Sequence, residues 1–305
     1  MIRFVARRIA TSAIAVFGVV TIIFVLARLV GDPVALMMQP GMTRADVAAL
    51  RHGLGVDEPI PQQYFHFVIG ALHGDFGISP WQSRPAFGLV MDRLPATLQL
   101  TVAALGFATV SGIALGTMAA ARPGSWIVRL CDAISMTGQA MPNFWLALML
   151  VLLLSTTLRW LPPAGYGHIE NLIMPTLSLG LFAMSRLARL VQSELEAALR
   201  QDYVRTARAK GLSEPVVLLR HALANVAIPL VTVLAVDFGL LMGGAVVTES
   251  VFAWPGVGRL LIQAIGQRDF PILQAGAFVI ATIVVMTSLL ADLAYAVLDP
   301  KIRHA

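Results

Sequence analysis

The sequence predicts an all-α polytopic membrane protein with six transmembrane helices. Of its 305 residues, 57% are hydrophobic and only 13% are charged, whereas soluble proteins average about 25% charged residues. The mean hydropathy is +0.78. Several apolar runs reach roughly 20 residues, the length that a helix needs to cross the hydrocarbon core of a bilayer. A water-soluble globular fold is therefore excluded.

The six expected spans are distributed along the whole chain. The first apolar run, Ile9 to Val30, is too long for the hydrophobic region of a signal peptide and predicts a retained helix. The other spans are expected near 95–121, 131–157, 171–191, 226–248 and 274–298. Pro142 predicts a bend in the third span, because proline lacks a backbone N–H and clashes with the preceding turn. A bent helix beside a pathway and an irregular core helix both fit this pattern.

Two patterns of small residues predict close helix packing. Gly112 to Gly116 lies in the second span and Gly239 to Gly243 in the fifth. Glycines four residues apart share one helix face and let a neighbouring backbone approach closely. We expect these faces to pack inside the chain, in preference to a dimer contact.

The distribution of basic residues predicts the orientation. Six spans place both termini on one side of the membrane, and the segments on that side hold fourteen of the 22 basic residues: Arg3, Arg7, Arg8, Arg122, Arg129, Arg186, Arg189, Arg200, Arg205, Arg208, Lys210, Arg220, Lys301 and Arg303. Basic residues concentrate in cytoplasmic segments, so both termini are expected in the cytoplasm. Segments 31–93, 158–170 and 249–273 are then external, and 192–225 is the long cytoplasmic connection.

Several functional classes lack the residues that they require. Cys131 is the only cysteine, so neither an intrachain disulfide nor a zinc module with cysteine ligands is expected. No P-loop or G-x-S-x-G motif occurs, and no H-E-x-x-H motif. His66 and His73 could share a helix face, but such a pair more often lies on a surface than at a metal. We expect no catalytic residues, no metal, no cofactor in this chain and no nucleic-acid partner.

The cytoplasmic connection contains the sharpest motif. Residues 201–213 predict a short amphipathic helix with Val204 and Ala207 on its apolar stripe, ended by Gly211. Ser213 and Pro215 are typical of the start of a second helix. Read from charge alone, the segment could be a basic loop that only fixes orientation.

The same stretch, from Asp202-Tyr203 through Thr206-Ala-Arg-Ala-Lys-Gly-Leu212, resembles the EAA loop of importer-type ABC permeases, in the variant of the dipeptide, oligopeptide and nickel permeases. Arg205-Thr206-Ala207 take the place of the E-A-A triplet, and the proline usual after Leu223 is absent. The resemblance implies that this loop lies in a groove of an ATPase subunit. The coupling residues would be Tyr203, Arg205, Thr206, Ala207, Arg208, Ala209, Lys210, Gly211 and Leu212.

Further motifs extend this resemblance over the chain: Gly31-Asp-Pro-Val34, Leu54-Gly-Val-Asp-Glu-Pro59, His73-Gly-Asp-Phe-Gly-Ile-Ser79, Leu94-Pro-Ala-Thr-Leu98, Thr248-Glu-Ser-Val-Phe252 and Asp299-Pro-Lys-Ile-Arg303. They are similar to the first permease subunit of a pair. The implied fold is a type I ABC importer transmembrane domain, with an N-terminal helix and external segment in 1–94 and a five-helix permease core in 95–305. The implied location is the cytoplasmic membrane of a bacterium.

The resemblance also implies the partners. They are a second homologous permease, two ATPase subunits that bind ATP and magnesium, an extracytoplasmic substrate-binding protein and membrane lipid. Trp254, Pro255, Gly256 and Arg259 are expected to dock this receptor or to gate the outer mouth. Segment 31–93 could equally be a cap, with weakly helical stretches at Thr43–His52 and Gln62–Leu72, and a short helix is expected at Arg259–Gln267.

Asp237 is the acidic residue closest to the middle of a span. A carboxylate at the bilayer centre costs about 2.5 to 3.5 kcal/mol on insertion scales, so it should face the bundle interior or water. One interpretation is that Asp237 lines the translocation path and favours a positive group. The other is that it ties helices together.

The implied function is import of di- or oligopeptides, driven by ATP hydrolysis in the partner subunits. Nickel or a metal chelate is the alternative substrate. A membrane sensor or scaffold that docks a signalling domain through 192–225 is the alternative of another class. A secondary transporter is a weaker alternative, because no internal repeat with paired broken helices is visible. The sequence does not identify the substrate.

Overall fold

A computed structural model describes residues 2–29 and 57–298, and between them only residues 34, 43–45, 48 and 51. The described chain is helical apart from one isolated bridge between Ile78 and Pro85. Its helices are α1 (Ile2–Leu29), α4 (Ile60–His73), α5 (Ala86–Ala121), α6 (Trp126–Ala140), α7 (Asn143–Leu150), η1 (Val151–Thr157), α8 (Ile169–Leu199), α9 (Asp202–Ala209), α10 (Glu214–Val216), η2 (Val217–Ala222), α11 (Leu223–Val251), α12 (Val257–Gln267) and α13 (Phe270–Leu298).

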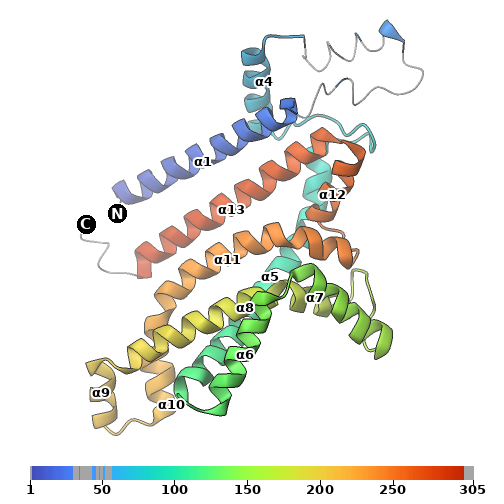
Figure 1. Cartoon of the computed structure of the whole chain (residues 1–305). Helices are drawn as coiled ribbons and strands as arrows, with labels where there is room; N and C mark the ends of the chain where they lie inside the picture. Colours follow the sequence, from blue (N-terminus) through green and yellow to red (C-terminus); the bar gives the residue numbers. More distant parts are fainter. Residues whose placement is uncertain are drawn as a thin grey trace.

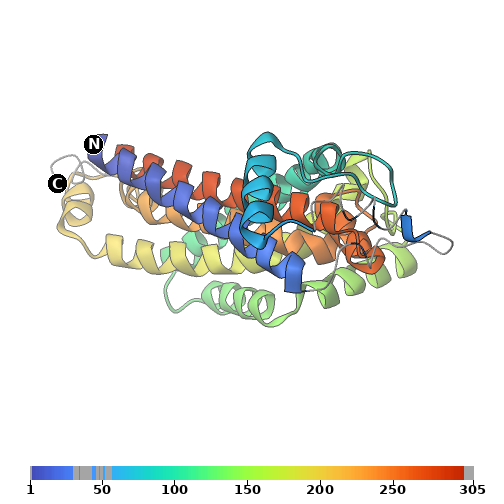
Figure 2. The same cartoon turned by 90° about the horizontal axis from the view of Figure 1, so that it is seen from above.

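The long helices form a bundle in which helices distant in sequence lie side by side (Figure 1). Helix α1 packs on α13, α13 on α11, and α11 on α8, while α5 packs along α8. The start of α1, the end of α13 and the short helix α9 lie at one end of the bundle, and α4 and α12 lie at the other (Figure 2). The predicted motif segments at 201–213 and 249–267 therefore lie at opposite ends of the molecule.

Four helical segments are long and apolar enough to span a membrane: Val5–Leu26, Ala86–Ala121, Pro229–Val251 and Phe270–Leu293. A bent pair, α6 with α7 and η1, is a fifth candidate. Helix α8 corresponds to the predicted span 171–191 and has 31 residues, but it is not among the candidates. It contains Arg186, Arg189 and three glutamates, which lower its apolarity. Of the six predicted spans, the structure thus supports four, or five if the bent pair is one span.

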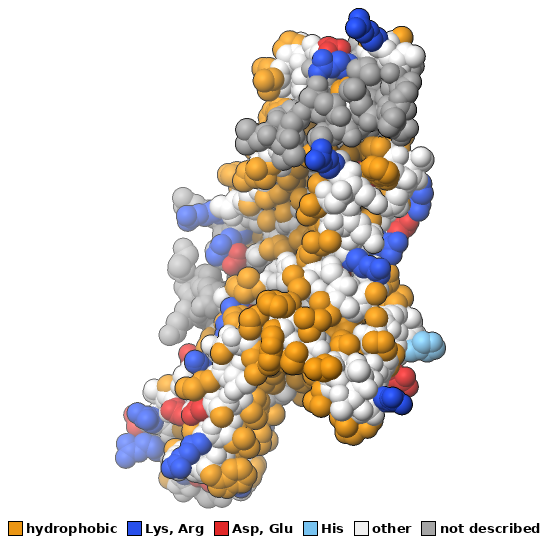
Figure 3. All heavy atoms as spheres, turned by 45° about the vertical axis from the view of Figure 1, so that its right-hand side comes forward, with side chains coloured by type: hydrophobic (Ala, Val, Ile, Leu, Met, Phe, Trp, Pro, Cys, Tyr) orange, Lys and Arg blue, Asp and Glu red, His pale blue; other side chains and the backbone are white. Residues whose placement is uncertain are grey.

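The surface is consistent with a membrane-embedded bundle. Hydrophobic side chains cover the middle of the face in Figure 3, and charged side chains lie around this area, toward both ends and along the edges. Large exposed hydrophobic residues on α1 include Ile14, Phe17, Ile22 and Leu26. In a soluble protein such a continuous apolar face would be an aggregation site, whereas lipid solvates it.

Pro142 divides the predicted third span. Helix α6 ends at Ala140, α7 begins at Asn143, and the two segments are bent by 107°. Pro142 has an extended backbone and occupies the N-cap of α7, where its missing N–H leaves no helical hydrogen bond unmade. The predicted bend in the span at 131–157 is confirmed, and it is a complete break: the proline starts a new helix that diverges from the bundle (Figure 1).

The external segment is anchored to the first helix. Helix α4 confirms the helical stretch predicted at Gln62–Leu72. The hydroxyl of Tyr64 shares a 2.7 Å hydrogen bond with Thr21 of α1, and its ring lies edge-on to Phe24 with centroids 5.3 Å apart. At the other end of α1, Arg8 forms a 3.1 Å ion pair with Asp292 of α13. The helix predicted at Thr43–His52 lies largely outside the described residues.

Small residues on α5 allow α8 to approach closely, as the first glycine pattern predicted. A Cβ at Gly112 would lie 2.8 Å from the Cβ of Leu187, and one at Gly116 would lie 2.8 Å from the Cβ of Val191. In the second pattern, Gly239 faces Val284 of α13, and nothing lies within 4 Å of the Cβ position of Gly243. The first pattern is therefore an intramolecular packing face. In the second pattern, Gly239 packs against another helix of the chain and Gly243 does not.

We predict that Gly116→Val destabilises the protein, because the added side chain must push α8 away from α5. Overpacking of this kind costs about 1–3 kcal/mol. Thermal unfolding of the detergent-solubilised protein measures the effect. The control is Gly106→Val on the same helix, where nothing lies within 4 Å of the Cβ position. Equal unfolding temperatures for the two variants would contradict the close contact.

Candidate functional site

The short helix α9 of the cytoplasmic motif is held against its own chain. It begins after Gln201, with Asp202 in its first turn, where a negative charge favours the helix dipole. Val204 and Ala207 are buried and cluster with Val217 of η2 and Leu199 at the end of α8. Gly211 ends the helix with φ 77°, a left-handed conformation that glycine adopts without strain.

The predicted coupling residues therefore divide into two groups. Ala207 is 5% exposed and faces the chain itself, so it is not available to another protein in this conformation. The exposed group comprises Tyr203, Arg205, Thr206, Arg208, Ala209, Lys210, Gly211 and Leu212. The apolar stripe, which the sequence suggested for a partner groove, instead attaches α9 to α8 and η2. Any partner contact must be made by the opposite face.

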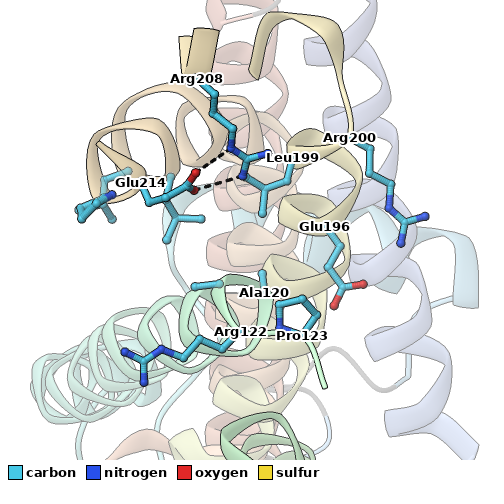
Figure 4. Close-up of a pocket in the computed structure, with 12 residues that line it drawn as sticks. Ala120, Arg122, Pro123, Glu196, Leu199, Arg200, Arg208 and Glu214 are labelled. Atoms are coloured by element: carbon cyan, nitrogen blue, oxygen red, sulfur yellow. Dashed lines mark hydrogen bonds and ion pairs between the residues drawn. The ribbon is translucent and has the colours of Figure 1, made fainter. Parts of the chain in front are cut away.

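A cavity of about 680 Å³ lies beside this helix (Figure 4). It is bounded by the end of α5, the end of α8, the α9–α10 turn and η2. Arg208 and Glu214 point toward each other across the turn and form two hydrogen bonds of 2.8 and 3.1 Å. These bonds to the carboxylate raise the pKa of Arg208 above its ordinary value, so the guanidinium stays charged. The pair fixes α9 relative to α10.

At the other end of the bundle, a buried carboxylate organises the turn between α11 and α12. Glu249 is fully buried. The Thr97 hydroxyl of α5 donates a 2.6 Å hydrogen bond to its Oε1, and the Arg259 backbone N–H donates a 2.9 Å bond to its Oε2. Thr97 also accepts a 2.8 Å bond from the N–H of Val257. The Thr97 hydroxyl and the Glu249 carboxylate together therefore accept N–H groups from the first turn of α12, which a helix cannot pair internally.

The glycines of the Trp-Pro-Gly-Val-Gly motif make room for this carboxylate. A Cβ at Gly256 would collide with the Glu249 carboxylate, and one at Gly258 would lie 2.8 Å from a methyl carbon of Val246. Trp254 is 1% exposed, and its indole N–H donates a 2.8 Å bond to the carbonyl of Ala96 on α5. We call Thr97, Glu249, Trp254, Gly256 and Gly258 the external brace.

The four residues expected to dock a receptor have different positions. Trp254 and Gly256 are buried in the external brace, while Pro255 and Arg259 are partly exposed. The Arg259 side chain donates a 2.7 Å bond to the carbonyl of Ala253 and closes the turn. Helix α12 confirms the short helix predicted at Arg259–Gln267 and extends it to Val257. Its exposed side presents Ile262 and Ile265.

A second link joins the external segment to the start of α13. The Ser79 hydroxyl donates a hydrogen bond to the Asp269 carboxylate, and both residues are fully buried. The indole N–H of the exposed Trp81 donates a 2.8 Å bond to the carbonyl of Gln267 at the end of α12. The segment between α4 and α5 is thus fixed to the α12–α13 junction.

Asp237 lies near the middle of α11, is 1% exposed, and forms an ion pair with Arg186 of α8. The sequence analysis counted Arg186 among the cytoplasmic-side charges, but α8 extends to Leu199 and places it close to the helix centre. The pair shows why Asp237 can be buried at this depth.

Sequence reasoning missed the roles of three residues: Arg186, Glu249 and Thr97. Two signals were visible in the sequence. One was the presence of opposite charges inside two apolar spans, and the other was an acidic residue before a Trp-Pro-Gly turn.

We predict that Glu249→Ala destabilises the α11–α12 turn, because it leaves the Thr97 hydroxyl and the Arg259 backbone N–H without their acceptor. Loss of a buried hydrogen-bonded partner costs about 1–3 kcal/mol. Thermal unfolding measures the loss, and Glu170→Ala, at an exposed position of α8, is the control. Combination with Thr97→Val should cost less than the sum of the single changes, since the residues share one network. Full additivity would contradict the shared network.

Comparison with known proteins agrees with this architecture. Residues 112–304 match the family described as binding-protein-dependent transport system inner membrane component, and residues 1–101 match the N-terminal region of such membrane components. The inward-facing MetNI methionine ABC transporter has a similar fold, with a TM-score of 0.58 at 20% identity, over 69% of this chain and 96% of that chain.

Full-length relatives have similar sequences. The dipeptide transport system permease protein DppB of Escherichia coli (strain K12) is 35% identical over 337 residues, which cover 100% of this chain and 99% of that protein. The di/tripeptide permease DppB of Pseudomonas aeruginosa (strain UCBPP-PA14) is 37% identical, with the same coverage. The glutathione permease GsiC of Escherichia coli (strain K12) is 35% identical over the whole of both chains. The chain therefore belongs to the inner membrane components of binding-protein-dependent transport systems, as a permease subunit and not an enzyme.

Proposed function

We propose that this chain forms one half of the translocation path of an ABC importer for di- or oligopeptides. The observation that supports the substrate class is the similarity, along the entire chain, to permeases named for dipeptides, di/tripeptides and glutathione. The other half is a second homologous permease. Two ATPase subunits bind ATP and magnesium, and an extracytoplasmic binding protein delivers the substrate.

In this proposal the bundle crosses the cytoplasmic membrane six times, with α8 as the additional span. The bilayer requires about 20 residues per crossing, and α8 has 31. The start of α1 and the end of α13 lie at the same end of the bundle as α9 (Figure 1). An even number of crossings places both termini on one side in this way. Basic residues concentrate there, so this end is cytoplasmic.

Coupling to the ATPases is assigned to the exposed face of α9. This helix is too short to be stable alone, and its buried stripe joins it to α8 and η2. Because η2 continues into α11, a force on α9 reaches both α8 and α11. Its outer face offers Tyr203, Thr206 and Ala209 between basic residues. A helix that inserts in a groove uses such a face.

At the external end, the receptor is proposed to contact partly exposed residues around α12. Pro255 and Arg259 remain candidates, and Trp81, Ile262 and Ile265 extend the exposed surface beside them. Trp254 and Gly256 would then act as a support for this surface from within the external brace. A docked receptor that displaced α12 would also move α5 and α11, because Thr97 and Glu249 link the three helices by hydrogen bonds.

We predict that Ala209→Trp reduces ATP-driven uptake at least tenfold, because a large side chain on the outer face of α9 does not fit a groove shaped for alanine. Uptake and ATP hydrolysis are measured with the complete complex in liposomes. Met118→Trp is the control, since Met118 is exposed near the same end of the molecule but belongs to α5 and does not line the cavity beside α9. Normal uptake by the Ala209 variant would reject the assignment of this face.

The function itself is tested with the four-subunit complex and its receptor in liposomes. A labelled dipeptide should accumulate only when ATP, both permeases and the receptor are present, and the isolated chain should neither hydrolyse ATP nor transport. Uptake of nickel instead of dipeptide would favour the metal or metal-chelate alternative. ATP-independent uptake by the isolated chain would favour a secondary transporter, and absence of any uptake would favour a sensor or scaffold.

A further inference from the structure

One face of α8 is not covered by this chain and is basic near its centre. Phe182, Arg186, Arg189 and Ser193 follow one another at helical spacing on this face. Phe182, Arg189 and Ser193 are exposed, and the Arg186 side chain is 33% exposed. The opposite face of α8, with Leu187, Ala188 and Val191, is buried.

This face differs in chemistry from the uncovered face of α1. The exposed central residues of α1 are Ile14, Phe17 and Ile22, which lipid tails solvate. Two arginines one turn apart would be costly at the same depth if they faced lipid, and such charges in transmembrane helices usually face a watery cavity or the bundle interior. The uncovered face of α8 therefore fits the wall of an aqueous path better than a lipid boundary.

The ion pair with Asp237 leaves part of the Arg186 side chain exposed. Nη2 of Arg186 pairs with Oδ1 of Asp237, and both Nη2 and Nε are buried, so the exposed third of the side chain does not include these two atoms. A guanidinium has five N–H donors, so one carboxylate does not exhaust it. Asp237 is 1% exposed, whereas Arg186 is one-third exposed. The group that faces the open side is thus the arginine and not the aspartate.

The local charge is positive. Arg186 and Arg189 contribute two positive charges, and Asp237 contributes one negative charge. The sequence suggested that Asp237 favours a positive group of the substrate. The structure does not favour this prediction, because the Asp237 carboxylate is buried and already paired with Arg186. An anionic group is the complementary ligand.

We propose that Arg186 binds the C-terminal carboxylate of a peptide in the translocation path. Asp237 is a positioning residue that orients the guanidinium, and Arg189 adds the second positive charge. The inference rests on the proposed function as a peptide importer. An arginine donates charged hydrogen bonds to a carboxylate, and these are stronger than bonds between neutral groups. Because every linear peptide with a free C-terminus has this group whatever its side chains, one arginine can serve substrates of varied sequence.

The test compares a dipeptide with a dipeptide amide, whose C-terminus has no charge. The complete complex is reconstituted in liposomes with excess receptor, and both peptides are chosen by calorimetry to bind and saturate the receptor. We expect Arg186→Gln to lower uptake of the free acid about tenfold, the size of a lost charged hydrogen bond, and to leave uptake of the amide unchanged. Arg129→Gln, at an exposed position of α6, should alter neither rate.

The expected outcomes are distinguishable. An unchanged ratio of free-acid to amide uptake in an assembled Arg186→Gln complex overturns the inference while leaving the function intact. If that variant does not assemble, because it leaves Asp237 unpaired, the charge-balanced variant Arg186→Gln with Asp237→Asn replaces it. Wild-type rates for the free acid in this double variant overturn the inference, and a selective loss supports it. Failure of the unmodified complex to import any peptide rejects the proposed function itself.

Discussion

The carboxylate of Glu249 is the interaction on which the end of the bundle around α12 depends. It lies at the end of α11, receives a hydrogen bond from Thr97 of α5, and accepts the backbone N–H of Arg259 in the first turn of α12. A buried charge of this kind is tolerated only when donors surround it. The requirement explains why the turn contains Gly256 and Gly258, whose missing side chains leave space for the carboxylate. Three helices are thereby joined at one point, with Trp254 packed beside it.

At the opposite end of the bundle, around α9, buried apolar side chains hold the structure together. Val204 and Ala207 join α9 to Val217 and Leu199, so the short helix is an attachment of α8 and η2 and not a free loop. Arg208 and Glu214 add a polar link at the turn. A permease that responds to its ATPases needs such rigidity, because a flexible connection would absorb the motion before it reached the spans.

The sequence predicted the helical class, the position of most spans and the two motif segments, because long apolar runs and turn residues act locally. It did not predict which side of a helix faces another. Ala207 was expected at a partner surface but lies inside, since the apolar stripe of a short helix can bury itself in its own chain as readily as in another. Arg186 was assigned to the cytoplasmic side, because its partner Asp237 is fifty-one positions away in sequence and only the packing of α8 on α11 brings them together. The sharp break at Pro142 likewise exceeded the bend that local chemistry predicts.

The continuity of α10, η2 and α11 has a mechanical consequence. From Glu214 to Val251 the backbone is helical without interruption, a path of up to about 57 Å at 1.5 Å per residue. One end of this path lies beside α9, and the other bears Glu249. Pro229 removes one backbone hydrogen bond near the cytoplasmic end, where such a rod flexes most easily. The helix can therefore act as a lever with its joint at Pro229, so that a small tilt of the part beside α9 is delivered as a larger displacement at the end that bears Glu249.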